Sequence, residues 1–156
     1  MTKIRKIFFA VTSSFFYIGY LPLIPGTFAS AAGVLLFYLI RYNTVIYILS
    51  TLLLIIFGLW VSGRQEEIVN RKDPSSIVID EVCGMLLSLM FIVPDLKLVV
   101  FAFFIFRILD TLKPYPAGTL QRLKGGIGIM GDDIIAGIYT NIILQLVLRL
   151  TSFSRS

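Results

Sequence analysis

The sequence predicts an all-α membrane protein with roughly four to six helices arranged in hairpins, in a single domain over residues 1–156. Apolar residues make up 57% of the chain and charged residues 15%, against about 45–50% and about 25% in ordinary soluble domains. A chain of this length cannot bury that much apolar surface in one soluble core. The apolar runs are mostly of helix length and show little strand alternation, so we expect helices in a membrane.

The first three apolar runs lie in the N-terminal part of the chain. Residues 7–24 follow a basic start and resemble a signal peptide, but they have no clear cleavage site and are expected to remain as a helix in or near the interface. Residues 28–40 form a second run, with Thr27 placed to cap it. Residues 44–62 carry no charge and would span about 28 Å as a helix, which makes them the best transmembrane candidate.

Three further apolar runs follow a polar segment. Asp73-Pro74 resembles a helix start, with Asp as cap and Pro in the first turn. A loop is expected over 111–131, and Asp132-Asp133 are expected to open the last helix. The runs themselves are 77–93, which contains Asp80 and Glu81, then 96–109 and 134–148.

Basic residues indicate the orientation of these helices. By the positive-inside rule, segments rich in Lys and Arg face the cytoplasm. Residues 28–62 and 77–109 would then form two hairpins that leave and return on the cytoplasmic side. This predicts a multi-pass protein of the cytoplasmic membrane, and the net charge of +5 fits an anionic membrane surface rather than nucleic acid. The basic segments are 3–6, 64–72, 107–124 and 149–155.

Several carboxylates lie in or against the apolar runs. A carboxylate at the centre of a bilayer costs at least about 2.5–3.5 kcal/mol, so such residues must be paired, solvated or bound to a cation. The hairpin arrangement puts them all at one level, on the cytoplasmic side. They are Asp80, Glu81, Asp110, Asp132 and Asp133.

The chemistry available to this group is restricted by what the chain lacks. There is no His, which excludes a His general base and a Ser/His/Asp triad. The single cysteine, Cys83, excludes a disulfide within the chain and is expected to be a small buried residue. A hard, oxygen-rich cluster suits Mg²⁺ best, with Mn²⁺ and Ca²⁺ as alternatives. Basic residues at the same level could hold a phosphate beside the cation, namely Arg107, Lys113, Arg122 and Lys124.

Simpler roles remain open for several of these residues. Asp132 or Asp133 could be a helix N-cap, and Arg107 and Asp110 could be only an i,i+3 ion pair. The segment 125–133 contains a formal G-x-G-x-x-G but lacks the preceding strand and the later acid of a dinucleotide site. Its glycine backbone could approach a phosphate or be a flexible linker. Pro25-Gly26-Thr27 could be a loop beside the phosphate, or a turn and cap.

Four segments occur in order along the chain and together resemble one known family. They are Pro25-Gly26-Thr27 with Ser30; Ile77-Val78-Ile79-Asp80-Glu81 with Gly84; Phe106-Arg107-x-x-Asp110-x-x-Lys113-Pro114; and Gly125-Gly126-x-Gly128-x-Met130-x-Asp132-Asp133 with Ala136-Gly137. The chain resembles the phosphatidylglycerophosphatase A family, lipid phosphatases of bacterial membranes, from about Pro22 to Asn141. Ala29 stands where the family's first element has a second Gly. Some relatives have a His before the Asp-Glu element, where this chain has Asp73-Pro74-Ser75-Ser76.

The resemblance implies a substrate, a cofactor and roles for the site residues. The substrate would be phosphatidylglycerophosphate, the products phosphatidylglycerol and inorganic phosphate, and Mg²⁺ would be required. Asp80, Glu81, Asp132 and Asp133 would bind Mg²⁺, and Asp110 would complete the cluster or position water. Lys113 and Arg107 would neutralise charge on the phosphoryl group. Further phosphate contacts would come from Gly125, Gly126, Gly128 and Thr27.

Three alternative functions remain open, and an experiment must distinguish them from the phosphatase. A CDP-alcohol phosphotransferase also uses Mg²⁺ and membrane carboxylates, but its sequence pattern is absent from this chain. A small membrane transport or interaction protein would use the same acids to gate ions or to pair with basic residues, without catalysis. A phosphatase of another phosphorylated lipid would keep the scaffold and change the substrate.

Overall fold

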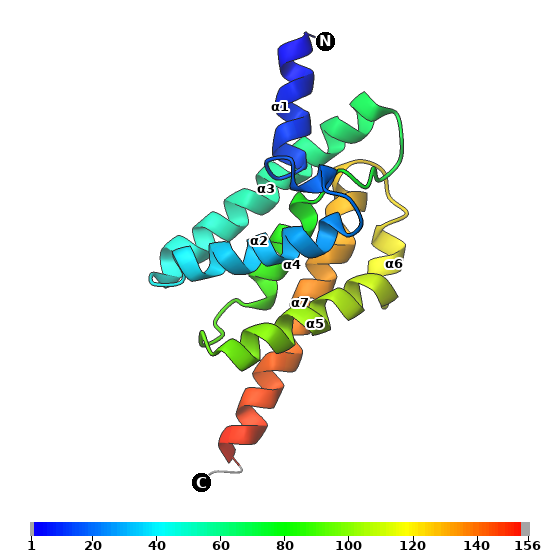
Figure 1. Ribbon diagram of the computed structural model, residues 1–156. Coiled ribbons are helices and arrows are strands. Elements are labelled where there is room, and N and C mark those ends of the chain that lie inside the picture. The colour runs from blue at the N-terminus through cyan, green and yellow to red at the C-terminus, as the bar shows by residue number, and fades with distance from the viewer. Residues whose placement is uncertain (1, 154–156) are drawn as a thin grey trace.

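The computed structural model describes the backbone of residues 2–153 and the side chains of residues 2–150. In this part of the chain all regular structure is helical, as the sequence predicts (Figure 1). Residues 2–153 contain seven α-helices, slightly more than the expected range, together with one short 3-10 helix. In chain order they are α1 (Lys3–Ser13), η1 (Ile18–Tyr20), α2 (Pro25–Ile40), α3 (Thr44–Val69), α4 (Ile79–Ser88), α5 (Leu96–Leu112), α6 (Ala117–Leu120) and α7 (Gly126–Phe153).

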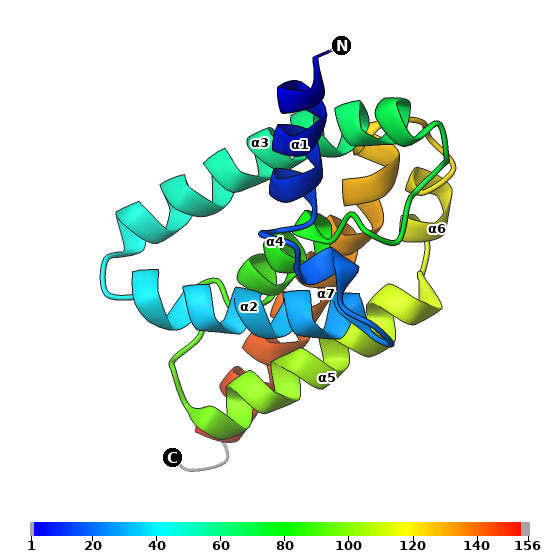
Figure 2. The ribbon, with the colours of Figure 1, turned by 45° about the horizontal axis from the view of Figure 1, so that its top comes forward.

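Helix α4 is the centre of the molecule, and α2, α3, α5 and α7 pack around it (Figure 2). Apart from Glu81 and Leu87, every residue of α4 is buried. A helix that is apolar on nearly all sides is stable only when other elements cover it. Its side chains pack into one core with residues of the surrounding helices, including Phe37, Phe106, Ala136 and Leu144. The only charged side chains on this central helix are Asp80 and Glu81, in its first turn.

The expectation of one helix over residues 7–24 is wrong. Helix α1 ends at Ser13, and Phe15, Phe16 and Tyr17 then have positive φ angles of 45°, 56° and 68°. The amide of Val78 donates to the carbonyl of Ser13 at 3.0 Å, so the segment entering α4 occupies the end of α1. Tertiary packing therefore overrides an apolar pattern that by itself favours a continuous helix.

Three expected helix starts are also corrected. Thr27 does not cap α2, because that helix begins at Pro25 and its N-cap position is Ile24. Asp73-Pro74 does not begin a helix: Asp73 has a left-handed φ of 47°, and α4 begins only at Ile79. Helix α7 begins at Gly126 instead of at Asp132, so Asp132 and Asp133 lie in its second turn and neither is an N-cap. The expected loop over 111–131 also contains the short helix α6. These starts are set by packing between helices, which local sequence signals do not report.

Among the described residues, two helices are long and apolar enough to cross a membrane. They are α3, over Thr44–Val69 with a mean hydropathy of 2.4, and α7, over Gly126–Leu150 with a mean hydropathy of 1.5. The expected span 44–62 lies within α3. Helix α4, with 10 residues, is roughly 15 Å long and too short to cross a bilayer.

The hairpin turns and the charged helix ends lie on different sides of the molecule. In both views the α2–α3 turn and the α4–α5 turn lie on the left, whereas α6 and the adjoining ends of α3, α5 and α7 lie on the right (Figures 1 and 2). Arg149 is near the far end of α7, roughly 25 Å along the helix from Asp132. The expectation that Arg149 lies at the same level as the other basic clusters is therefore wrong. Arg155 lies outside the described residues.

Candidate metal and phosphate site

Three carboxylates from two helices form the centre of the site. Asp80 and Glu81 lie in the first turn of α4, and Asp133 lies in the second turn of α7. One carboxylate oxygen from each lies within 4.8 Å of the others. Asp80 and Asp133 are buried and Glu81 is partly buried. Residues 53 positions apart in the sequence are thus brought to one point, as the hairpin arrangement predicts.

Two glycines allow α4 and α7 to approach closely enough for this. Gly84 lies one turn after Asp80, and Gly137 lies one turn after Asp133. A Cβ on Gly84 would lie 2.8 Å from the main-chain oxygen of Asp133, and a Cβ on Gly137 would lie 2.5 Å from the oxygen of Gly84. The backbones are therefore in direct contact just behind the carboxylates, and no side chain larger than hydrogen fits there.

The three carboxylates are suited to hold a cation. Asp80 Oδ1, Glu81 Oε2 and Asp133 Oδ1 are buried and have no hydrogen-bond partner. Buried polar atoms are normally satisfied, and buried charges are normally paired or bound to metal. Burial and the neighbouring Glu81 carboxyl raise the pKa of Asp80 well above its usual range, and burial also raises the pKa of Glu81. A divalent cation bound to these oxygens would compensate for both effects. All donors are oxygen, which suits Mg²⁺.

Two ion pairs border the carboxylate group. Arg107 Nη1 donates to Asp110 Oδ2 at 2.8 Å, which is the i,i+3 pair on α5 that the sequence offers as an alternative. Lys113, at the end of α5, donates to Asp132 on α7. Burial lowers the pKa of Lys113, but the hydrogen bond and charge of Asp132 outweigh it, so this pKa is raised. Lys113 is therefore protonated at neutral pH.

Gly26 connects the first sequence element to this group. A Cβ on Gly26 would lie in contact with Glu81 Oε1 and 3.2 Å from both terminal nitrogens of Arg107. The start of α2 thus forms one wall of the site, directly against an acidic and a basic side chain. Within the same turn, the amide of Thr27 donates to the carbonyl of Ile24 at 3.1 Å.

Other residues expected in the site have different contacts. Asp132 lies outside the group of three and bonds to Lys113. Gly125 donates its amide to Glu66 Oε2 at 2.6 Å. Gly126 and Gly128 approach the main-chain oxygens of Leu59 and Leu123. The metal role expected for Asp132 and the phosphate contacts expected for Thr27 and these glycines stay predictions.

Glu66 and Asp73 are near the site and were not singled out by the sequence. Asp73 is close enough to Asp80 for its charge to contribute to the raised pKa of that residue. Glu66 accepts bonds from the amides of Asp73 and Gly125. Glu66 stands beside Glu67 in a polar segment, and only the packing of α3 against α7 distinguishes the two.

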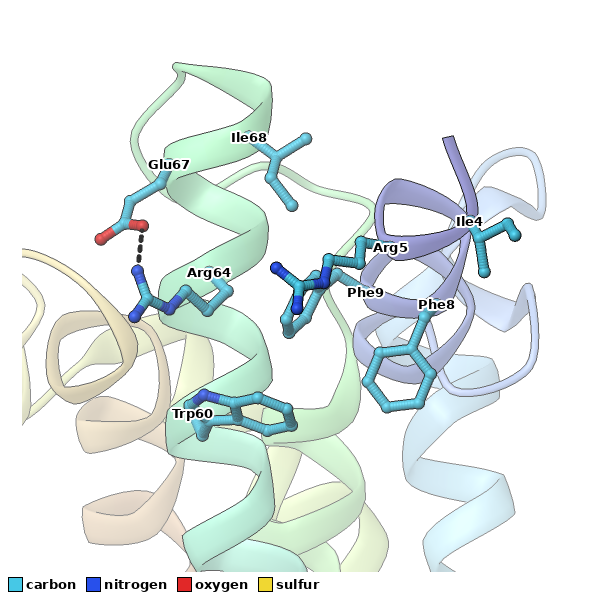
Figure 3. Close-up of a pocket in the computed structure, with 8 residues that line it drawn as sticks. All are labelled: Ile4, Arg5, Phe8, Phe9, Trp60, Arg64, Glu67 and Ile68. Carbon is cyan, nitrogen blue, oxygen red and sulfur yellow. Dashed lines mark hydrogen bonds and ion pairs between the residues drawn. The ribbon is translucent and has the colours of Figure 1, made fainter. Parts of the chain in front are cut away.

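A surface hollow of about 650 Å³ lies away from the carboxylates, between α1 and α3 (Figure 3). Phe8, Phe9 and Trp60 line its apolar part, while Arg5 and Arg64 extend beside them. Arg64 pairs with Glu67 at 2.9 Å. No member of the carboxylate group lines this hollow, so it is separate from the candidate cation site.

Comparison with known proteins identifies the family. The family model described as phosphatidylglycerophosphatase A matches residues 11–148, which include every residue of the carboxylate group. The chain belongs to the phosphatidylglycerophosphatase A family. It is therefore an enzyme of the phosphatase class, and the four sequence elements that suggested this resemblance are the ones that surround the site.

Individual relatives agree in class but differ in the lipid that their names give. An Escherichia coli phosphatidylglycerophosphatase A is 37% identical over 132 residues, covering 83% of this chain and 77% of the relative. The Haemophilus influenzae phosphatidylglycerophosphatase A is 34% identical, covering 77% of this chain and 76% of the relative. A Bacteroides thetaiotaomicron protein, whose name provisionally describes it as a phosphatidylinositol-3-phosphatase, is 32% identical and covers 82% of this chain and 86% of its own length. No solved structure matches this member of the phosphatidylglycerophosphatase A family.

Proposed function

We propose that this chain is a Mg²⁺-dependent phosphatase that converts phosphatidylglycerophosphate to phosphatidylglycerol and inorganic phosphate. The observation that carries the proposal is the group of Asp80, Glu81 and Asp133. One carboxylate oxygen of each lies within 4.8 Å of the others, and each residue has a buried oxygen that lacks a hydrogen-bond partner. The two relatives named phosphatidylglycerophosphatase A support this choice of lipid.

Each charged side chain has a role in this proposal. Asp80, Glu81 and Asp133 would hold Mg²⁺, which when bound polarises the phosphoryl group and lowers the pKa of water. Asp110 holds the Arg107 guanidinium beside Glu81, and Asp132 holds the Lys113 ammonium. The two cations stabilise negative charge on the phosphoryl oxygens. Overall, the oxygen of water bonds to phosphorus, the phosphorus–oxygen bond to glycerol breaks, and the glycerol oxygen gains a proton.

We place the site at the cytoplasmic surface of the membrane. Trp60 on α3 and Phe8 on α1 lie next to Arg5 and Arg64 at the hollow in Figure 3. Aromatic rings beside basic residues are typical of the boundary between hydrocarbon and headgroups. After Arg64, α3 continues into a segment rich in charge, on the side where α5 ends and α7 begins. A phosphate on a lipid headgroup would therefore reach the carboxylates while its acyl chains stay in the bilayer.

The direct test is phosphate release by the purified protein in detergent, with and without Mg²⁺. Asp133→Asn should reduce phosphate release by at least about 100-fold, because it removes one ligand charge from the group. Asp95→Asn is the matched control: Asp95 caps α5 at the α4–α5 turn, away from the site, and Asn also caps helices well. Full activity of Asp133→Asn, or activity of the wild type that is independent of divalent cations, would contradict the proposal.

A second substrate deserves a parallel assay. The Bacteroides relative, at 32% identity, has a name that gives a phosphatidylinositol phosphate as its substrate. Both lipids present a phosphate monoester on an anionic headgroup, so the same carboxylates and cations would serve either. Turnover of phosphatidylglycerophosphate and phosphatidylinositol 3-phosphate should be compared at equal concentration. A preference for phosphatidylinositol 3-phosphate would change the proposed substrate but not the proposed reaction.

A further inference from the structure

The two chain segments that lead into the site are tied together outside it. Residues 70–78 lead into α4, which carries Asp80 and Glu81, and residues 121–125 lead into α7, which carries Asp133. Gln121 Nε2 donates to Asp73 Oδ2 at 3.2 Å. Lys72 Nζ donates to the carbonyl of Arg122, also at 3.2 Å. The entries to the two ligand-bearing helices are therefore bonded directly to each other.

Glu66 of α3 contacts both segments through a single carboxylate. Its Oε1 accepts the amide of Asp73 at 3.2 Å, and its Oε2 accepts the amide of Gly125 at 2.6 Å. Asp73 lies seven residues before Asp80, and Gly125 lies seven residues before Asp132. One side chain thus holds the backbone at the same sequence separation ahead of both carboxylate pairs. A carboxylate at the N-terminus of α7 is also favoured by the helix dipole.

The helix that presents Glu66 is itself fixed against α7. Leu59, Gly63 and Glu66 lie on one face of α3, at spacings of four and three residues. A Cβ on Gly126 would collide with the main-chain oxygen of Leu59, and a Cβ on Gly63 would lie 2.9 Å from the amide nitrogen of Gly126. Because the backbones of α3 and α7 are in contact one turn before Glu66, the position of its carboxylate relative to the two loops is fixed.

The bond to Asp73 acts at a strained point of the chain. Asp73 has a left-handed φ of 47°, a conformation that non-glycine residues adopt only when their surroundings hold them there. Its amide is held by Glu66 and its carboxylate by Gln121. Loss of either contact frees the segment that sets where α4 begins.

We infer that Glu66 is a positioning residue that clamps the entries of α4 and α7 and so holds Asp80 and Glu81 against Asp133 at cation-binding distance. This inference rests on the proposed function of the carboxylate group. Glu66 itself does not belong to the group of three, so it acts on the cation only through the loops. Groups that orient metal ligands in this way typically change metal affinity by about 10–100-fold when they are replaced.

Glu66→Gln is the decisive variant, with Glu67→Gln as its matched control. Glutamine keeps the length of Glu66 but replaces one acceptor oxygen with an NH₂ group, which would face one of the two amide donors. Glu67 is the next residue on the same helix, is exposed, and pairs only with Arg64 among the described residues. Binding of Mn²⁺ to the purified protein is measured by electron paramagnetic resonance of the free ion, and the Mg²⁺ dependence of phosphate release is measured in parallel.

The expected result is an increase of about 10-fold in the Mn²⁺ dissociation constant for Glu66→Gln, with a parallel increase in the Mg²⁺ concentration for half-maximal activity. Glu67→Gln should stay within about twofold of the wild type, and its thermal midpoint without metal should be similar to that of the wild type, because it loses only an exposed ion pair. Wild-type Mn²⁺ affinity in Glu66→Gln would overturn the inference.

A second variant keeps the test decisive if Glu66→Gln does not fold. Gln121→Ala removes only the side-chain bond to Asp73, and should weaken Mn²⁺ binding in the same direction by about threefold, the equivalent of one modest hydrogen bond. Unchanged binding in that variant would also overturn the clamp. A wild-type protein that neither binds Mn²⁺ nor releases phosphate would instead contradict the proposed function, so the two failures are distinguishable.

Discussion

At the scale of single residues, we expect that a side chain at Gly26 is excluded for functional rather than structural reasons. Gly26→Ala would place its Cβ against Glu81 Oε1 and Arg107, both of them flexible side-chain ends that can move. We expect the Mg²⁺ concentration for half-maximal activity to increase by about 10-fold, with little change in the thermal midpoint. On the same helix, Gly33→Ala would meet the Cβ of Met85 at 2.8 Å and the Val82 oxygen at 3.1 Å, so it should lower the thermal midpoint instead.

Variants of the Lys113–Asp132 pair can distinguish a catalytic role of Lys113 from a purely structural one. Lys113→Met leaves the buried Asp132 without its partner, which should cost about 1–3 kcal/mol of stability and nearly abolish phosphate release. Adding Asp132→Asn removes the uncompensated charge and should restore much of the thermal midpoint. If Lys113 acts on the phosphoryl group, activity should stay low in the double variant. Recovery of activity along with stability would show that Lys113 only neutralises Asp132.

At the scale of elements, the crossing of α4 and α7 sets the geometry of the carboxylates. Gly84→Ala would place a Cβ 2.6 Å from the ring of Phe106 and 2.8 Å from the oxygen of Asp133. Because a backbone and a buried ring cannot move easily, the two helices should separate, with a loss of about 1–3 kcal/mol and a large loss of Mg²⁺-dependent activity. Both are measured by thermal unfolding and by Mg²⁺ titration of phosphate release.

Gly58→Ala on α3 provides the matched control for this crossing. Its Cβ would lie 2.8 Å from the terminal methyl of Met130, a distance similar to that at Gly84. The end of a methionine side chain adapts readily, whereas a backbone does not. Gly58→Ala should therefore retain activity and most of the stability. Equal damage from both substitutions would mean that local crowding alone, and not the approach of α4 to α7, explains the effect at Gly84.

At the scale of the whole molecule, the two ends of the helical bundle should face opposite sides of the membrane. Tyr42 and Lys124 are both exposed. The α2–α3 turn, which contains Tyr42, and the segment before α7, which contains Lys124, lie at opposite ends (Figure 1). After Cys83→Ser, single cysteines at 42 and 124 can be treated with a membrane-impermeant maleimide on spheroplasts. The Tyr42→Cys protein should react in intact spheroplasts, and the Lys124→Cys protein only after permeabilisation. The reverse pattern would put the site on the outer side.

The sequence by itself determined the class of fold, the family and the identity of the charged residues. The composition and the length of the apolar runs were sufficient to predict the helices, because a chain with this much apolar surface can satisfy its backbone and bury that surface in few other folds. The rarity of carboxylates in apolar runs was sufficient to select a group of five, because unpaired charge there is too costly to persist without a purpose. The five are Asp80, Glu81, Asp110, Asp132 and Asp133. Both signals are local, so they can be read along the chain.

Only the tertiary structure decided which acids share a centre and what holds them there. Asp132 and Asp133 are adjacent in sequence, yet one bonds to Lys113 and the other joins Asp80 and Glu81, because neighbours on a helix point about 100° apart. Likewise Glu66 and Glu67 look alike in sequence, and only the contact between α3 and α7 turns Glu66 toward the two loops. Which side of a helix meets a neighbour depends on packing between distant segments, and that information is absent from any local pattern.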